Sequence, residues 1–411
     1  MRIPLNRLLL SVALGSLGQG LTLPYLVVYL HTQRHIAAGV TGLAVGVAAF
    51  ASFVLSGPFG YFVDKFGPAR VLFVGRISTG LATASWAFVH TETQVYLVAI
   101  LTAVTQSLNW GPQGAFIGRL TDEENRQRYF GISFLFVNLG IGLGGVVGAL
   151  ILLHPSLHAF QSLYLLNAVA WCASGVVVLT IMKYGRAVVV EHHREHGGYA
   201  RVVRDTRLWW MVLVGLVMVI VGYGSLEIGY PAYVTQVAGL PKSAVGFGFA
   251  ANSITIVVAQ MFVLKRLEGR SRAYTLAGVA SLWALSWLVL GATALVPLSA
   301  ALVLVIVAQG IFGFAETGYM PVLNTVINNL APEALRGRYN AVAGISWGVG
   351  NSLGPALAGL AIAAGAGKVW LLAIVGGCMV AALLATRLHH VLTPEQDGRV
   401  TAPGLHPAAE E

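Results

Sequence analysis

The feature of this sequence that most limits its fold is a series of apolar runs, each long enough to cross a membrane. A helix needs about 20 apolar residues to cross the roughly 30 Å of hydrocarbon in a bilayer. The runs do not alternate apolar with polar residues, so they indicate helices rather than the strands of a barrel. We place them at residues 8–30, 39–61, 71–90, 94–118, 129–153, 161–182, 208–235, 243–264, 273–295, 298–323, 339–364 and 368–387. The sequence therefore predicts an all-α membrane protein with twelve transmembrane helices.

The composition agrees with a chain whose main surroundings are a lipid bilayer. Hydrophobic residues make up 56% of the 411 residues and charged residues only 10%, whereas about 25% charged residues is usual for soluble domains. The net charge of +9 does not indicate a nucleic-acid partner, because no basic run is interleaved with aromatic residues. Cys172 and Cys378 each lie in an apolar run and are expected to pack rather than to form a disulfide.

The Lys and Arg residues predict the orientation in the membrane. If both termini lie on one side, all but three of the 25 Lys and Arg residues fall on or near that side, the exceptions being Arg34, Lys242 and Lys368. Positively charged loops of membrane proteins stay in the cytoplasm. We therefore expect a multi-pass protein of the plasma membrane or the bacterial inner membrane, with both termini in the cytoplasm.

A long polar connection divides the predicted helices into two sets of six. We expect an N-terminal lobe at 1–183, a cytoplasmic loop at 184–206, a C-terminal lobe at 207–390 and a disordered cytoplasmic tail at 391–411. The lobes repeat each other, since a shift of 210 positions aligns identical residues such as Arg126 with Arg336 and Gly144 with Gly354. This duplication predicts two pseudo-symmetric lobes with a substrate cavity between them, in a chain that works as a monomer.

A polar segment between the second and third runs carries the most specific local pattern. Residues 60–70 place Asp64 and Lys65 beside two glycines and a proline. They resemble the loop between helices 2 and 3 of the major facilitator superfamily of transporters, although Pro68 and Ala69 replace basic residues of the family pattern. The resemblance implies a cytoplasmic gate, and the alternative is a solvated turn that serves topology alone. The predicted gating residues are Gly60, Asp64, Lys65, Gly67, Arg70, Arg119, Arg126 and Arg338.

Small residues on the fifth and eleventh runs carry a second resemblance. They resemble the helix 5 motif of the drug–proton antiporters of this superfamily, except that Gly144 precedes Gly145 where the family has proline. The resemblance implies export, whereas the alternative is close helix packing alone. Residues 105–110 on helix 4 lack the buried Arg that such antiporters often carry. The motif and its repeat copy comprise Gly131, Gly140, Gly144, Gly148, Gly350, Gly354 and Pro355.

Two carboxylates fall well inside predicted helices, where a charge is costly and usually faces a cavity. Glu227 lies on helix 7 and Glu316 on helix 10, and we expect both to exchange protons that drive transport. The alternatives are a structural hydrogen bond for Glu316 and a water-exposed position near the outer interface for Glu227. Arg76, on helix 3, is expected to reach the cytoplasmic surface. In the repeat, Glu316 aligns with the neutral Gln106.

Polar and aromatic residues at intermediate depths predict the substrate site. Aromatic faces with few charges suit an amphipathic or hydrophobic substrate, including a cationic one. His192 and His196 have helical spacing, but a solvated linker is favoured and no metal site is predicted. The predicted cavity residues are Gln19, Tyr25, Gln106, Asn109, Trp110, Asn138, Tyr230, Tyr319, Asn324 and Trp347.

These patterns predict a secondary active transporter rather than an enzyme. The expected activity is proton-coupled efflux of small amphipathic or drug-like compounds by alternating access, with no cofactor and with the proton gradient as the energy source. No phosphate-binding glycine loop with its lysine occurs, so ATP drive is not indicated. The alternatives are a transporter of a physiological solute, such as a sugar, amino acid, peptide or lipid, and, less favoured, a polytopic enzyme, a receptor or a channel.

The gate hypothesis predicts the effect of one substitution. Asp64→Asn removes the charge that would hold the cytoplasmic side closed, so we expect transport in reconstituted vesicles to slow about tenfold. Glu92→Gln, in a loop on the opposite side, serves as the control and should have no effect. An unchanged rate for the Asp64 variant would contradict the gate.

Overall fold

The computed structural model describes residues 2–121, 123–185, 199–267, 269–332 and 335–399. For some of these residues, Asp64 and Arg126 among them, only the backbone is described. The described chain is helical almost throughout and contains no β-strand. The prediction of an all-α protein is confirmed.

The first half of the chain forms six helical rods. Because α1, η1 and α2 follow one another without a loop, they make one rod, and α4 with η2 makes another. The elements are α1 (Arg2–Thr22), η1 (Leu23–Tyr25), α2 (Leu26–Arg34), α3 (Ala38–Phe66), α4 (Pro68–Ser85), η2 (Trp86–Phe88), α5 (Glu92–Leu120), α6 (Glu123–Ile151) and α7 (Leu157–Leu179).

The second half forms six more rods, of which the first is built from four short elements. The chain enters this half through η3 (Met182–Gly185) and α8 (Tyr199–Val203). The other elements are α9 (Thr206–Val221), α10 (Tyr223–Glu227), α11 (Gly229–Ala232), the π-helical turn η4 (Tyr233–Val237), α12 (Lys242–Leu267), α13 (Arg272–Ala292), η5 (Thr293–Leu295), α14 (Leu298–Leu330), α15 (Arg336–Ala363) and α16 (Gly367–Val391).

Length and apolar character qualify most of these rods to cross a membrane. Ten of them, within the described residues, are long and apolar enough to do so. The other two, α5 and α15, are 29 and 28 residues long and pack among the rest. The rods correspond to the twelve predicted spans. Polar residues define where several begin: the Thr91 hydroxyl accepts from the Gln94 amide at the start of α5, and the Asp205 carboxylate accepts from the Arg207 amide at the start of α9.

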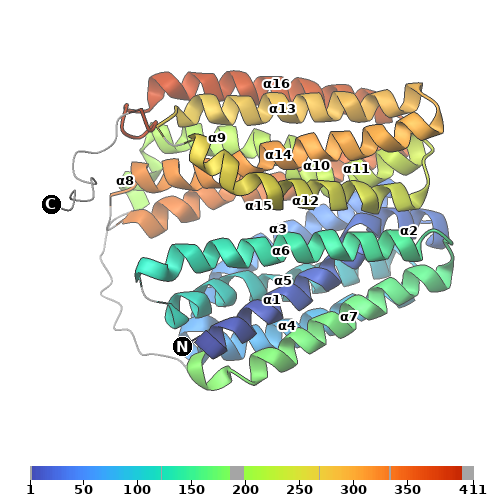
Figure 1. Ribbon diagram of the computed structural model, residues 1–411, viewed down its shortest axis with the longest axis horizontal. Coiled ribbons are helices and arrows are strands. Elements are labelled where there is room, and N and C mark those ends of the chain that lie inside the picture. The colour runs from blue at the N-terminus through green and yellow to red at the C-terminus, as the bar shows by residue number, and fades with distance from the viewer. Residues whose placement is uncertain (1, 122, 186–198, 268, 333–334, 400–411) are drawn as a thin grey trace.

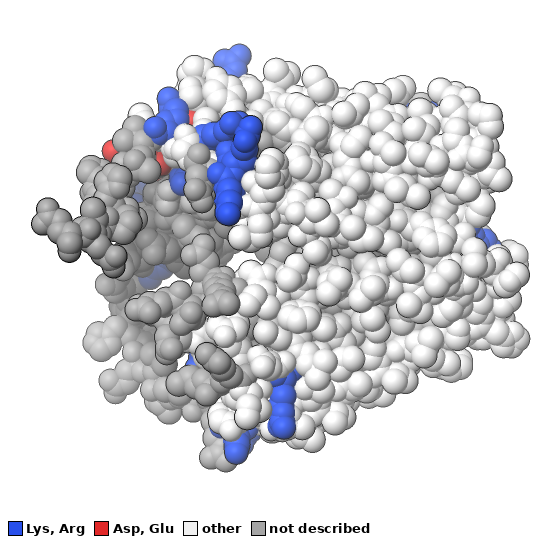
Figure 2. Space-filling view, viewed as in Figure 1, with Lys and Arg blue, Asp and Glu red and all other residues white. Residues whose placement is uncertain are grey.

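The rods are arranged as two lobes that lie side by side (Figure 1). The lobe formed by α1 to α7 lies below the lobe formed by α9 to α16 in this view, and α1 begins at the same end of the bundle at which α16 ends, the end called here that of the termini. Across the lobes, α3 packs against α15 and α6 packs against α12. Figure 2 shows that Lys and Arg side chains gather at the end where the termini lie, while most of the remaining face is uncharged.

The segment at residues 60–70 differs from the predicted turn. Helix α3 continues to Phe66, and the single residue Gly67 separates it from α4, which begins at Pro68. Gly67 has φ 83°, a value that glycine adopts without strain, and proline suits the first position of a helix. The reversal therefore needs one residue rather than a loop. The prediction that Asp64 lies in a turn is wrong, because its backbone belongs to the last turns of α3.

The first rod of each lobe is interrupted near a proline, which the apolar runs did not indicate. These rods are the one from α1 to α2 and the one from α9 to η4. Pro24 lies in η1 and Pro231 in α11, and proline cannot donate the hydrogen bond that a continuous helix needs. The rod of helix 7 breaks a second time at Gly222, which has φ −95° and ψ −98°. Each lobe thus has a discontinuous first helix, as the internal repeat requires.

The first part of the C-terminal tail is folded, contrary to the predicted disorder from residue 391. Asp397 is fully buried, and its carboxylate accepts hydrogen bonds from the Ser271 hydroxyl at 2.7 Å and the Ala273 amide at 2.9 Å. It also pairs with Arg399 at 2.9 Å and with His389 at 3.0 Å. The pattern of Pro, Gly and acidic residues hid this role, because the partners of Asp397 come from two other helices. Residues 400–411 lie outside the described part.

The tail contacts predict a loss of stability when Asp397 is replaced. Asp397→Ala removes charge-assisted hydrogen bonds that cap α13, and we expect a loss of about 1–3 kcal/mol. Thermal unfolding of the purified protein, followed by tryptophan fluorescence, should shift down by a few degrees. Glu395→Ala, at an exposed position of the same segment, should leave the midpoint unchanged, and equal midpoints for both variants would contradict the assigned role.

Candidate functional site

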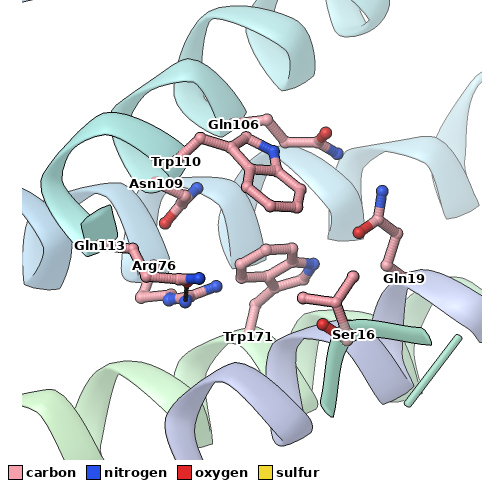
Figure 3. A pocket seen from close by; sticks show the side chains of 9 residues that line it. Ser16, Gln19, Arg76, Gln106, Asn109, Trp110, Gln113 and Trp171 are labelled. Carbon is pink, nitrogen blue, oxygen red and sulfur yellow. Dashed lines mark hydrogen bonds between the residues drawn. The ribbon is translucent and has the colours of Figure 1, made fainter. Parts of the chain in front are cut away.

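A small polar cavity lies inside the N-terminal lobe, between α1, α4, α5, α6 and α7 (Figure 3). Its volume of about 20 Å³ is room for one water molecule. Three of the predicted cavity residues from helix 4, and Gln19 from helix 1, contribute to it. The lining consists of Ser16, Gln19, Arg76, Gln106, Asn109, Trp110, Gln113, Val137 and Trp171.

Arg76 is buried in this cavity, with only 3% of its surface exposed. Its Nη2 donates a 2.7 Å hydrogen bond to Gln113 Oε1, and its guanidinium lies 4.8 Å from the ring centre of Trp171. The prediction that Arg76 reaches the cytoplasmic surface is wrong. The reason is a space left by two glycines: a Cβ on Gly15 would lie 2.8 Å from Arg76 Nη1, and one on Gly175 would lie 3.3 Å from Arg76 Cβ.

Hydrogen bonds connect the polar residues of the cavity across three helices. Gln113 Nε2 donates to Ser133 Oγ at 3.3 Å, and Asn109 Nδ2 donates to Thr79 Oγ1 at 3.0 Å. This network fixes the orientation of Gln113 and therefore of the guanidinium. Buried polar atoms normally have partners, but Arg76 Nε, Asn109 Oδ1 and Trp171 Nε1 have none among the described residues.

The C-terminal lobe gathers a carboxylate and an aromatic cluster. Glu316 is half-buried on α14, Asn252 Nδ2 donates to its Oε2 at 3.5 Å, and the Tyr223 hydroxyl lies beside it. The Tyr223 ring lies 5.7 Å from that of Tyr319 and 5.0 Å from that of Trp347. The structure thus brings together three predicted site residues, Glu316, Tyr319 and Trp347.

Sequence reasoning missed other members of this cluster. Tyr223 follows the break at Gly222. A glycine directly before a tyrosine in an apolar run could have indicated this position. Trp283 packs against Tyr223 at 5.9 Å and against Tyr319 at 5.3 Å. Its position in an apolar run on α13 gave no sign of this contact. The contact of Asn252 on α12 with Glu316 could not be predicted either, because a lone amide in a membrane helix can have many roles.

Tyr25 and Tyr230, two more of the predicted substrate-cavity residues, do not line this small cavity, and neither has exposed surface. The Tyr25 hydroxyl donates to the Gly145 carbonyl at 3.4 Å and lies against Gly246 of the other lobe. The Tyr230 hydroxyl donates to the Val245 carbonyl at 3.1 Å. Tyr25 lies in η1 and Tyr230 in α11, at the interruptions of the first rod of each lobe, and both hydroxyls reach backbone carbonyls.

The remaining predicted cavity and coupling residues are scattered. Asn138 is buried, and its Nδ2 donates to the Phe134 carbonyl of its own helix. Asn324 is exposed on α14. Glu227 is half-buried at the end of α10, one turn beyond Tyr223, and it is not part of the contacts made by Glu316.

The glycines of the antiporter-like pattern pack helices within each lobe. A Cβ on Gly140 would meet Ser16 and Leu17 of α1, while Gly144 and Gly148 meet Leu17, Gly20 and Tyr25 of the same rod. On α15, Gly350 and Gly354 lie in the same way against Val219 of α9 and Gly224 of α10. Gly131 has open space around it, and the Pro355 carbonyl faces Gly42 of the other lobe. The repeat therefore preserves the contact between α1 and α6 of the N-terminal lobe as the contact of α9 and α10 with α15 in the C-terminal lobe.

The predicted gating residues gather at the end of the bundle where the termini lie. Lys65 and Arg70 are exposed, and Lys65 Nζ lies 5.4 Å from the ring centre of Phe66. Arg119 ends α5 and Arg338 lies in the first turn of α15. The side chains of Asp64 and Arg126, and the surroundings of Gly60, lie outside the described part.

The described residues contain no cluster of side chains that could hold a metal ion. No group of three or more His, Cys, Asp or Glu side chains is found there. His192 and His196 lie outside the described residues.

Comparison with known proteins decides the family. Two matches to the family described as Major Facilitator Superfamily cover residues 8–306 and 287–408. The chain belongs to this superfamily. Its two-lobed, twelve-rod fold and the resemblance of residues 60–70 agree with that assignment.

Relatives of this chain include an antiporter and a multidrug resistance protein. A Na(+), Li(+), K(+)/H(+) antiporter of Planococcus maritimus is 22% identical over 363 residues, which cover 81% of this chain and 83% of that protein. Multidrug resistance protein MdtH of Photorhabdus laumondii is 26% identical over 247 residues, 57% of each protein. The crystal structure of a POT family transporter in complex with 5-aminolevulinic acid has a TM-score of 0.76 at 14% identity, covering 95% of this chain and 96% of that one. The chain is thus a multi-pass transporter of the major facilitator superfamily.

The position of Tyr25 predicts how the two lobes respond to a substitution at Gly246. The added side chain of Gly246→Val would collide with the Tyr25 hydroxyl, so we expect the lobes to separate at the end away from the termini. Electron–electron distance measurements between spin labels at Leu153 and Pro241, in a cysteine-free background, should show a longer distance. Leu153 follows the end of α6, Pro241 directly precedes α12, and both are exposed.

Gly278→Val is the matched control, because nothing lies within 4 Å of a Cβ at that position on α13. It should leave the label distance as in the unsubstituted protein. The same distance distribution in the Gly246 variant as in this control would show that Tyr25 does not hold the lobes together.

Proposed function

We propose that this protein is a proton-coupled secondary transporter that exports small amphipathic or drug-like compounds by alternating access. The observation that carries the proposal is the Glu316 carboxylate, half-buried inside the C-terminal lobe with Asn252 and Tyr223 as neutral neighbours. Its nearest described partners bring no positive charge. A carboxylate inside a membrane helix without a cation is costly when ionised, and this cost favours exchange of a proton.

The coupling mechanism follows from the position of Glu316. An ionised Glu316 carboxylate can only accept a hydrogen bond from the neighbouring Tyr223 hydroxyl, whereas the protonated carboxyl group can also donate one. Tyr223 lies directly after the break at Gly222 in helix 7, where the backbone is least constrained. Protonation of Glu316 would therefore alter the contacts of a helix that also packs against helix 11. Glu227, at the next break of the same rod, is proposed as a second proton-exchanging group.

The substrate class is supported by the contrast between the lobes. The N-terminal lobe offers a polar cavity with two tryptophans, and the C-terminal lobe offers the cluster of Tyr223, Trp283, Tyr319 and Trp347. Trp347 is 41% exposed and Trp110 is 59% exposed, so both present aromatic surface to a ligand. An amphipathic molecule can use both kinds of surface. The names of the antiporter and of the multidrug resistance protein among the relatives support this class.

The remaining parts of the proposal concern location and gating. The gathering of Lys and Arg at the end where the termini lie supports a cytoplasmic location of that end. The membrane would be the plasma membrane or the bacterial inner membrane, the working unit a monomer, and the energy source the proton gradient without a cofactor. Asp64 with Arg338, Arg119 or Arg126 would form the latch of the cytoplasmic side.

A resistance assay tests this function. Bacterial cells that lack their own major exporters should tolerate several-fold higher concentrations of some amphipathic toxic compounds when they express the protein. Glu316→Gln keeps the size of the side chain but cannot exchange a proton, so it should remove most of this resistance at equal expression. Glu92→Gln should retain it.

Two results would contradict the proposal. One is the absence of resistance to every compound in a broad amphipathic panel. The other is full resistance conferred by the Glu316 variant, since coupling through this carboxylate would then be unnecessary.

A further inference from the structure

We propose that Arg76 and the cavity around it bind the anionic group, a carboxylate, sulfonate or phosphate, of the transported compound. This inference rests on the proposed function, because it specifies the substrate of the same transporter. It assigns to the substrate a charge opposite to that expected from the aromatic residues alone.

The first argument is the unbalanced charge of Arg76. No carboxylate among the described residues pairs with Arg76, whereas Asp397 in the tail pairs with His389 and Arg399. The contacts of Arg76 are the neutral Gln113 and the ring of Trp171. A guanidinium buried to this degree carries a desolvation cost of several kcal/mol that these contacts do not offset fully. A charge held at such a cost within a transporter lobe is explained by an anionic ligand that completes it.

The second argument is the set of unused hydrogen-bond donors. Arg76 Nε and Trp171 Nε1 are buried, can only donate, and have no partner among the described residues. Both belong to residues that line the same cavity. An anionic oxygen accepts from such donors, whereas a cationic group would be repelled by the guanidinium. The donor set therefore selects for negative charge.

The third argument is that the guanidinium is held in place. Gln113 Oε1 accepts from Arg76 Nη2, and the amide of Gln113 donates to Ser133. This leaves Nε without an acceptor among the described residues and fixes its direction. Figure 3 shows Arg76 and Gln113 on one side of Trp171, and Gln19 on the other side. A preorganised donor costs a ligand less ordering entropy than a mobile one.

Access to the site comes through Trp110, which lines the cavity and is 59% exposed. The cavity has room for only about one water molecule, so an anionic group can enter only if Trp110 moves. The rings of Trp110 and Trp171 then flank the bound group. This arrangement suits an aromatic compound with an acidic substituent.

Two dyes with the same ring system provide the test. The anion 8-anilinonaphthalene-1-sulfonate and the neutral N-phenyl-1-naphthylamine differ by the sulfonate, and both fluoresce when bound. We expect the full-length purified protein to bind the sulfonate dye more tightly than the neutral one. Arg76→Gln should weaken binding of the sulfonate dye about tenfold or more and change that of the neutral dye less than twofold.

Arg387→Gln is the matched control, because it removes a positive charge from an exposed position on α16 and should leave both affinities unchanged. Arg76→Lys keeps the charge but loses the forked donor, so it should bind the sulfonate dye with intermediate affinity. This second variant, together with the ratio of the two dye affinities in the unsubstituted protein, decides the matter if Arg76→Gln does not fold.

The proposal is overturned if the unsubstituted protein binds both dyes equally, or if both Arg76 variants bind the sulfonate dye as before. Uptake of the dyes into proteoliposomes separates this outcome from failure of the proposed function. Arg76-dependent binding without gradient-driven uptake of either dye would leave the anion site standing and contradict the transporter. Uptake that is independent of Arg76 would do the reverse.

Discussion

The two lobes of this transporter meet through helix faces on which glycine lets one backbone touch another. Gly42 lies against the Pro355 carbonyl and Gly359, and Gly145 lies against Gly246. Within a bilayer there is no hydrophobic force between helices, so association depends on close van der Waals contact and on hydrogen bonds between them. Smooth faces of this kind hold the lobes in register without interlocking side chains. Such faces would let one lobe rock on the other, as the proposed alternating access requires.

Within each lobe, other glycines serve a different purpose, because they make room for polar side chains. Gly15 and Gly175 create the space that Arg76 occupies. Gly313 on α14 lies against the backbone of Asn252, the residue that donates to Glu316. One lobe thus encloses a guanidinium and the other a carboxylate, and in the repeat Glu316 aligns with Gln106, which lines the cavity of Arg76. Neither is neutralised by an opposite charge among the described residues, and each is available to a ligand or a proton.

Much of the fold could be predicted from the sequence, because membrane crossing requires long apolar runs that are easy to recognise. The breaks near Pro24 and Pro231 could not be predicted from the prolines alone, because Pro112, Pro321 and Pro355 lie inside continuous helices. The burial of Arg76 could not be predicted, because it depends on glycines of two other helices. The burial of Asp397 could not be predicted either, since its hydrogen-bond partners come from the start of α13 and from α16.

The candidate site was predicted in part for similar reasons. Glu316 is conspicuous as a carboxylate in an apolar run, and its aromatic neighbours Tyr319 and Trp347 were selected by residue type. Tyr25 and Tyr230 have the same residue type but lie at the helix breaks, where their hydroxyls reach backbone carbonyls. Residue type indicates what a side chain can do, and only packing decides which of those things it does.

The central claim, that a proton gradient drives movement of an organic compound through this chain, is tested most directly in proteoliposomes. A compound to which the protein confers resistance would be supplied outside vesicles with an acidic interior, and its internal concentration followed over time. The account predicts accumulation above the passive level that collapses when an uncoupler is added. Equilibration to the passive level, with the same rate before and after the uncoupler, would contradict it.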